Sequence, residues 1–132
     1  MNTVVMTAWR HDAFDTDNLI AMSELAAWLD RLGFSWRLAV GSYKGAVEQS
    51  VIVDSVGASG VIQLRQLGAS YEQECVLVVC DDGGAYLLPC DGGFAETVGF
   101  WHEVGVELAL KQEAWTSCDG HWFVVHPTLE GN

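Results

Sequence analysis

The stretch that decides the fold is Gly41-Ser-Tyr-Lys-Gly-Ala-Val-Glu-Gln-Ser-Val-Ile-Val53, which predicts a strand end, a tight turn and a second strand. Gly45 is the turn residue, because glycine adopts positive φ without a steric penalty. The residues that follow are rich in β-branched side chains, which favour a strand. Glu48 lies inside this second strand, among residues that favour burial. Its carboxylate is therefore either a solvated side chain on an open sheet face or an anion on the wall of a site.

The flanking sequence extends this hairpin into a β-α-β-β-α-β order. Apolar residues recur at helical spacing in two segments, and Asp15 or Thr16 is placed to cap the first and Ser55 or Ser59 the second. A continuous β-branched run, typical of a central strand, follows the second helix. The predicted strands are 3–9, 34–42, 47–54 and 74–81, and the predicted helices are 15–33 and 55–71.

This order is the split-βαβ, ferredoxin-like pattern, an α+β fold in which two helices cover one face of an antiparallel sheet. Further strands are expected at 85–89 and 96–106, the latter with partly helical character through Lys111. A C-terminal hairpin of 113–118 and 121–126 is expected to close at Asp119-Gly120, a strong turn signal. No linker or repeat interrupts the chain. We therefore expect one domain over 1–132, with a loose tail from about 127.

Composition narrows the classes of function. The 132 residues carry six Lys and Arg against eighteen Asp and Glu, a formal charge of −12 that repels nucleic acid and anionic membranes. This charge is compatible with simple solubility, with a cationic substrate, or with an acidic surface that imitates DNA. No apolar run approaches the ~18 residues of a membrane span. The N-terminal segment lacks the basic start of a signal peptide, so a cytoplasmic protein is expected.

The usual signatures of metal and nucleophilic chemistry are missing from the sequence. The four cysteines do not form paired CxxC motifs, the four histidines are scattered, and neither set has metal-ligand spacing. The cysteines are expected to be small buried hydrophobes. The two Asp-Gly-Gly turns at 82–84 and 91–93 each precede a strand and lack the lysine of a phosphate loop. No Ser-His-Asp or Cys-His arrangement is recognisable either, and no metal site is expected.

Two side chains of the hairpin have both a structural and a functional interpretation. If Val51 and Val53 pack against the helices, alternation directs Glu48 to the opposite face of the sheet. That face would be wet in a lone domain and covered in an oligomer, and base rates for glutamate favour the solvated interpretation. The ring of Tyr43 could close the core at the hairpin, or it could orient a ligand or receive a cation.

Several segments nevertheless resemble the phage-encoded S-adenosylmethionine lyases, formerly called S-adenosylmethionine hydrolases. Thr7-Ala-Trp-Arg10, followed by Asp15 and Asn18 at a helix start, is similar to the beginning of that family. The turn around Tyr43 resembles its Gly-x-Tyr stretch, and Glu48-Gln-Ser-Val-Ile-Val53 resembles its Glu-led strand. Tyr71-Glu-Gln-Glu-Cys-Val-Leu-Val78 is similar to its most specific segment. The likeness runs in order through residues 5 to 80 and is more diffuse afterwards.

The resemblance implies a homotrimer with S-adenosylmethionine bound between subunits as the substrate, and no cofactor. It implies cleavage to 5′-methylthioadenosine and homoserine lactone by the substrate's own carboxylate, which in phage depletes the cofactor of host restriction and methylation in the host cytoplasm. The family's functional Tyr and Glu correspond to Tyr43 and Glu48. The family member used for comparison has a longer loop between the two, whereas only four residues separate them here. Gln73 and Asn18 are further expected substrate contacts.

Two other classes of function remain open at this level. One is a non-enzymatic acidic protein that mimics DNA and inhibits restriction, which the charge favours. Its acids, however, are spread among loops and helix caps. The other is a trimeric sensor that binds a small molecule and leaves it intact. Turnover of S-adenosylmethionine would discriminate both from a lyase.

Overall fold

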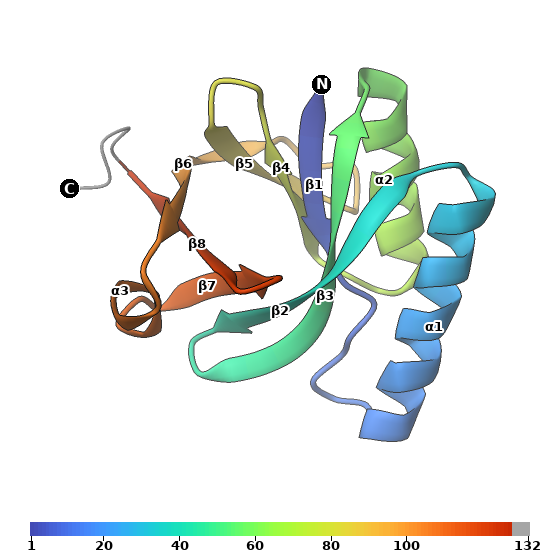
Figure 1. Cartoon of the computed structure of the whole chain (residues 1–132). Coiled ribbons are helices and arrows are strands. Elements are labelled where there is room, and N and C mark those ends of the chain that lie inside the picture. The colour runs from blue at the N-terminus through green and yellow to red at the C-terminus, as the bar shows by residue number, and fades with distance from the viewer. Residues whose placement is uncertain (128–132) are drawn as a thin grey trace.

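The computed structural model describes residues 1–127, and these form eight strands and three helices (Figure 1). The strands are β1 (Asn2–Met6), β2 (Ser35–Tyr43), β3 (Ala46–Val56), β4 (Cys75–Val79), β5 (Gly84–Pro89), β6 (Glu96–Val104), β7 (Ala114–Cys118) and β8 (His121–His126). The helices are α1 (Asp15–Arg31), α2 (Ala58–Ser70) and α3 (Val106–Leu110). The β-α-β-β-α-β order of the first six elements is therefore confirmed, and the expected helical character after β6 is the short helix α3.

The sheet is a closed antiparallel barrel, so the predicted ferredoxin-like α+β fold is wrong. Its strands follow the order β1-β3-β2-β7-β8-β6-β5-β4, and β4 pairs with β1 to complete the ring. The C-terminal strands are not additions beside an open sheet, because β7 pairs with β2 and β5 pairs with β4. Both strands that would have been sheet edges are thereby hydrogen-bonded. Closure removes the unpaired edges that an open sheet exposes to other chains.

Strand β3 separates two apolar cores. Val51 and Val53 belong to the larger core, which contains the buried side chains of α1 and α2 on the outer face of the barrel. Ile52 belongs to a smaller core inside the barrel, where it packs with Ala39 and Cys118. The predicted alternation along β3 is confirmed. Glu48 and Ser50 lie on the Ile52 face, which looks into the barrel.

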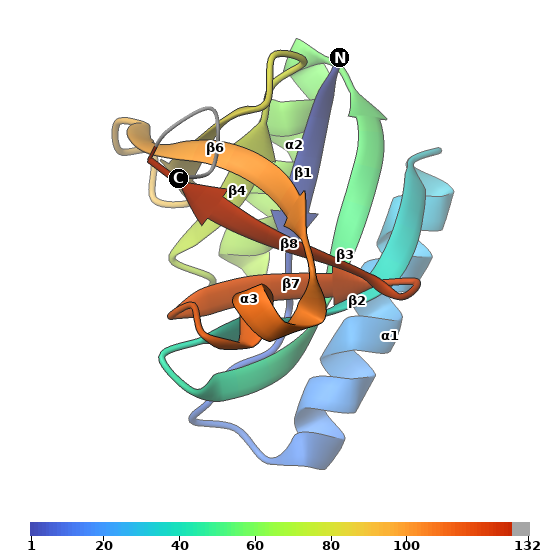
Figure 2. The same ribbon diagram turned by 60° about the vertical axis from the view of Figure 1, so that its left-hand side comes forward.

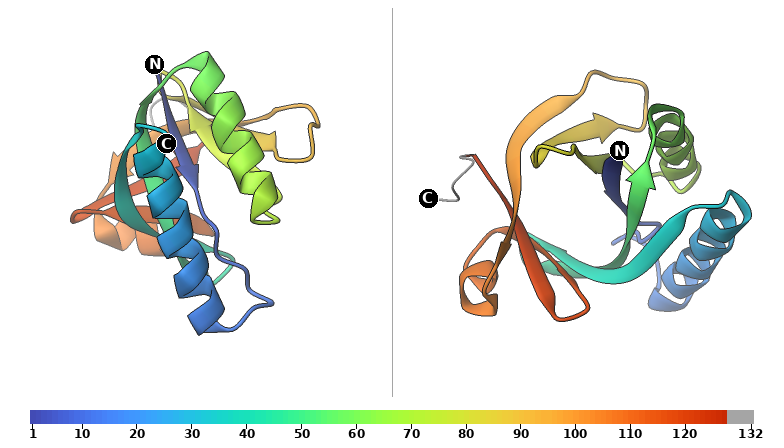
Figure 3. Two further views of the ribbon diagram at one scale, coloured as in Figure 1. Left: turned by 90° about the vertical axis from the view of Figure 1, so that its right-hand side faces the viewer. Right: turned by 45° about the horizontal axis from the view of Figure 1, so that its top comes forward.

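Helices α1 and α2 pack side by side on one side of the barrel, while α3 lies against β7 and β8 on the other (Figures 1 and 3). Figure 2 shows α3 together with the three strands β6, β7 and β8 that close the ring. The predicted side-chain caps are wrong, because Phe14 and Gly57 occupy the N-cap positions of α1 and α2 without side-chain cap bonds. Their buried apolar stripes are therefore the main support of these helices.

The two predicted hairpin turns are confirmed. Lys44 and Gly45 have φ values of 52° and 83°, and Asp119 and Gly120 have φ values of 51° and 81°. Positive φ at both central positions is the type I′ pattern, whose twist matches that of paired strands. The expected loose tail lies, apart from Pro127, outside the described residues. Among residues 1–127, no helix combines the length and apolarity needed to cross a membrane.

Candidate functional site

The side chain of Glu48 is partly buried at the rim of the barrel. Glu48 pairs with Gly41 across the β2–β3 hairpin, and its side chain is 24% exposed. The barrel itself covers the β3 face that was expected to be wet in a lone domain. That expectation was wrong because it assumed an open sheet. The carboxylate is therefore partly buried even within one subunit.

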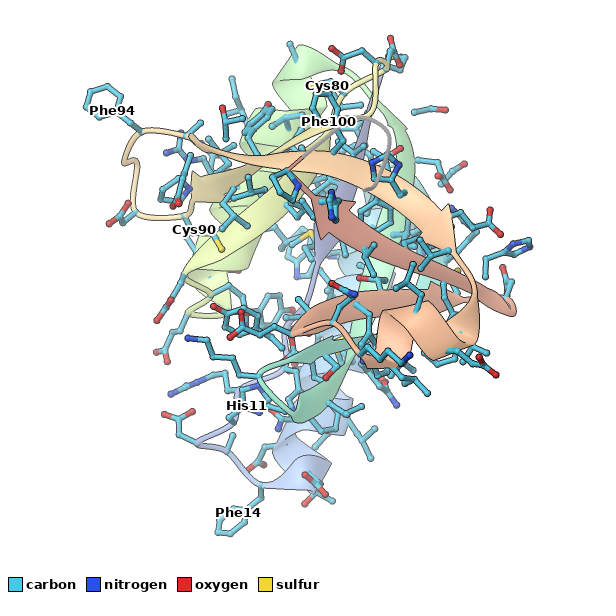
Figure 4. The ribbon with its side chains drawn as sticks, turned by 90° about the vertical axis from the view of Figure 1, so that its left-hand side faces the viewer. His11, Phe14, Cys80, Cys90, Phe94 and Phe100 are labelled. Carbon is cyan, nitrogen blue, oxygen red and sulfur yellow. The ribbon has the colours of Figure 1, made fainter. Side chains whose placement is uncertain are left out.

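Electrostatics around Glu48 are set by burial and by one histidine. Oε2 of Glu48 lies 3.0 Å from Nε2 of His11, in the loop between β1 and α1. Burial raises the pKa of the Glu48 carboxyl, and the nearby His11 partly opposes that rise. A partly desolvated carboxylate interacts more strongly with a cation than one in bulk water. Figure 4 places His11 beside the β2–β3 hairpin, close to the rim.

Asn18 secures the loop that carries His11. It is 2% exposed, and its side chain binds both backbone groups of Arg10. The Arg10 amide donates to Oδ1 at 2.9 Å, and Nδ2 donates to the Arg10 carbonyl at 2.8 Å. The sequence predicted Asn18 as a substrate contact. In the structure both of its polar groups bind Arg10 and fasten the loop to α1, and the substrate contact stays a prediction.

Gln73 holds the same loop from the other side. Its Nε2 donates to the carbonyl of Trp9 at 2.9 Å, and the neighbouring Glu72 forms an ion pair with Arg10. Thr7 adds a third anchor, because its hydroxyl donates to the Gln49 carbonyl on β3 at 2.6 Å. The loop is thereby tied to α1, to β3 and to the segment before β4.

Tyr43 lies at the tip of the hairpin, where β2 ends. Its side chain is 59% exposed and stands beside Lys44, whose ammonium is 5.2 Å from the centre of the ring. Tyr43 lies on the same face of the hairpin as Glu48, because its pairing partner Ala46 is two residues from Glu48. The structure thus brings Glu48, Asn18 and Gln73 together around one loop and leaves Tyr43 at the edge of that site.

Sequence reasoning missed two residues of this region. His11 gave no signal, because a histidine in a polar loop has no periodicity or motif to mark it. Ser50 was counted within the β-branched run, yet it is 5% exposed and its hydroxyl has no hydrogen-bond partner among the described residues. A single polar residue inside an apolar strand was the available signal.

Among the described residues, no cluster of three His, Cys, Asp or Glu side chains has metal-binding geometry. All four cysteines are free thiols, and only Cys118 is fully buried. Burial raises the pKa of the Cys75, Cys90 and Cys118 thiols, which keeps them protonated at neutral pH.

Two surface hollows lie away from Glu48. One of about 470 Å³ follows α1 past Leu19 and Ile20, and another of about 510 Å³ lies between β5 and β6 beside Tyr86 and Phe100. Among the described residues, the only carboxylates that line them, Glu24 in the first and Asp82 in the second, are exposed, although Cys80 and Tyr86 in the second are partly buried. We place the candidate site at Glu48, because a partly buried carboxylate with a titratable partner is the stronger indication of chemistry.

Comparison with known families identifies a match over most of the chain. The model of the S-Adenosylmethionine lyase family matches residues 4–126, which span all eight strands apart from the first two residues of β1. No curated protein matches the sequence.

Proposed function

The chain belongs to the S-adenosylmethionine lyase family, and we propose that it cleaves S-adenosylmethionine to 5′-methylthioadenosine and homoserine lactone. The observation that supports this most directly is the partly buried Glu48 carboxylate on the barrel rim. A partly desolvated carboxylate can attract a cationic metabolite more strongly than one in bulk water. The absence of a recognisable triad in the sequence agrees with a reaction in which the protein supplies no nucleophile.

The reaction that we propose is intramolecular. A carboxylate oxygen of the substrate attacks its own γ-carbon, the carbon–sulfur bond breaks, and the electron pair stays on sulfur as the neutral thioether. A five-membered lactone forms, and neither water nor a protein base takes part. The protein has to fold the methionine chain into a near-attack shape and exclude water.

We assign Glu48 to the ammonium of the substrate rather than to its sulfonium. The ammonium keeps its charge throughout the reaction, whereas the sulfonium loses its charge in the transition state. A carboxylate at the sulfonium would therefore stabilise the reactant more than the transition state and slow the reaction. His11 contacts Oε2 of Glu48 and orients the carboxylate, which makes Oε1 the atom for the substrate.

The other predicted residues receive different roles in this proposal. Asn18 and Gln73 act as positioning residues, because their side chains fasten the loop that brings His11 to Glu48. Tyr43, on the exposed hairpin tip, orients the reacting chain from the edge of the site. We further propose a homotrimer in which a neighbouring subunit supplies the adenine pocket. Light scattering on the purified protein tests that assembly.

Glu48→Gln tests the function. This change preserves size and hydrogen-bonding shape but removes the charge. Loss of one charge-assisted contact of about 1.5–3 kcal/mol lowers kcat/KM by roughly 10- to 150-fold. The measurement is release of methylthioadenosine, followed by time-resolved NMR that detects whether lactone or homoserine appears first. Near wild-type turnover by Glu48→Gln would remove Glu48 from the mechanism.

The same assay separates the competing functions. Binding to a restriction enzyme with no methylthioadenosine release would favour the acidic inhibitor that the charge of −12 suggests. Binding of S-adenosylmethionine without its cleavage would favour a sensor. Depletion of the methylation cofactor during phage infection is the biological role we propose for turnover.

A further inference from the structure

Ser50 is the least satisfied polar side chain of the barrel interior. It is 5% exposed, and among residues 1–127 its hydroxyl is the buried side-chain polar atom without a hydrogen-bond partner. A buried hydroxyl that forms no hydrogen bond destabilises the folded state. Native proteins contain few such groups, and an uncompensated one requires an explanation. Binding of a ligand would supply the missing partner.

The hydroxyl of Ser50 lies near Gly41, a position that has no side chain. A Cβ atom built on Gly41 would lie 3.7 Å from Oγ of Ser50 and 3.8 Å from the carbonyl oxygen of Trp115. Gly41 is also the cross-strand partner of Glu48, so Glu48 and Ser50, two residues apart on β3, both lie next to the space above Gly41. Three strands therefore line this space, since Trp115 belongs to β7.

We propose that Ser50 binds the α-amino-acid group of the substrate in the space above Gly41, together with Glu48. A hydroxyl both donates and accepts hydrogen bonds, so it can serve either the ammonium or the carboxylate of that group. Gly41 is then a specificity residue, because it leaves room where another residue would place a side chain. The inference rests on the proposed function and deepens it by locating the amino-acid end of the substrate.

Variants of Ser50 and Gly41 should retain the stability of the wild type and bind the substrate's amino-acid group less well. Ser50→Ala removes a buried, unsatisfied hydroxyl, so the variant should be as stable as the wild type or more stable. Gly41→Ala adds a methyl group whose neighbours lie at ordinary van der Waals distances, so it should also fold. Both variants should bind the amino-acid group less well. A merely structural role for either residue would not combine these two effects.

Binding of two ligands to the full-length protein tests the proposal by calorimetry. S-adenosylhomocysteine carries the amino-acid group, whereas methylthioadenosine has the same nucleoside without it. We expect Ser50→Ala and Gly41→Ala to weaken S-adenosylhomocysteine binding by about tenfold, or ~1.4 kcal/mol, and to leave methylthioadenosine within twofold. Ser42→Ala, a serine on the opposite face of the same hairpin, is the matched control and should change neither.

The outcomes separate this inference from the proposed function. If Glu48→Gln loses turnover but Ser50→Ala and Gly41→Ala bind S-adenosylhomocysteine like the wild type, the inference is overturned and the function stands. Equal weakening of both ligands would also overturn it, because the space would then serve the nucleoside. If the wild type neither binds nor cleaves S-adenosylmethionine, the function and the inference fail together.

Discussion

Replacing Asn18 with alanine should both destabilise the protein and reduce its activity. Asn18 is 2% exposed and makes two hydrogen bonds, of 2.9 and 2.8 Å, to the amide and the carbonyl of Arg10. Alanine removes both bonds and leaves a small cavity beneath the loop. Loss of a buried hydrogen-bond partner costs about 1–3 kcal/mol for each group left unpaired. Because Arg10 is only partly buried, water can recover part of this, and we expect a total loss of about 2–3 kcal/mol.

This loss corresponds to a measurable change in melting temperature. At about 2.1 cal/mol/K per residue, a chain of 132 residues has an unfolding entropy of about 0.28 kcal/mol/K. The expected loss therefore lowers Tm by about 7–11 °C, which differential scanning calorimetry resolves. The value of kcat/KM should fall as well, because the loop that positions His11 against Glu48 loses its hydrogen bonds to α1.

Two variants control this experiment. Ser23→Ala, on the exposed side of the same helix, should change the free energy of unfolding by less than about 0.5 kcal/mol. Asn18→Asp keeps an acceptor for the Arg10 amide but loses the donor to the Arg10 carbonyl. Its Tm should therefore lie between the Tm of Ser23→Ala and the Tm of Asn18→Ala. A Tm for Asn18→Ala within about 2 °C of the wild type would show that these bonds do not stabilise the loop.

Two further predictions concern Glu48 and the closure of the barrel. Because burial raises the pKa of Glu48 above its ordinary value of 4.5, the stability that this carboxyl contributes is present below about pH 4.5 and lost as pH rises through the raised pKa. Glu48→Gln should therefore gain stability relative to the wild type at pH 7 but not at pH 4 in urea denaturation, and an equal difference at both pH values would contradict this. Gly99 has a φ of 133°, and a Cβ there would collide with the backbone carbonyl of His126. Gly99→Ala should separate β6 from β8 and abolish cooperative unfolding by circular dichroism, whereas Gly105→Ala, where a Cβ meets nothing within 4 Å, should not.

The functional family was accessible from the sequence, but the roles of the site residues were less so. Short segments around Tyr43, Glu48 and Tyr71 carried the resemblance, and the family match over residues 4–126 confirms it. The substrate contacts of Asn18 and Gln73 stay predictions, and the partners of these side chains within the chain were not predicted. Their hydrogen bonds reach Arg10 and Trp9, and the second of these spans 64 positions of the chain. Sequence spacing cannot reveal a contact of that range.

The hairpin turns and the alternation of side chains along β3 could be predicted from local sequence rules. The type I′ turns at Lys44-Gly45 and Asp119-Gly120 depend on the φ preferences of single residues, and the inward face of Glu48 depends on the two-residue period of a strand. These are properties of adjacent residues, so the amino-acid sequence determines them directly.

Only the tertiary structure decided that the sheet closes. Each strand of an antiparallel hairpin has a second edge that can form hydrogen bonds with another strand. The residues of the strand itself do not determine which other strand pairs with that edge. In the structure β2 pairs with β7 and β4 pairs with β5, so neither of the expected sheet edges stays unpaired. That closure covers the face of β3 on which Glu48 lies and raises the pKa of its carboxyl by desolvation. The sequence by itself determined which way this side chain points, and the long-range pairing of strands determined what surrounds it there.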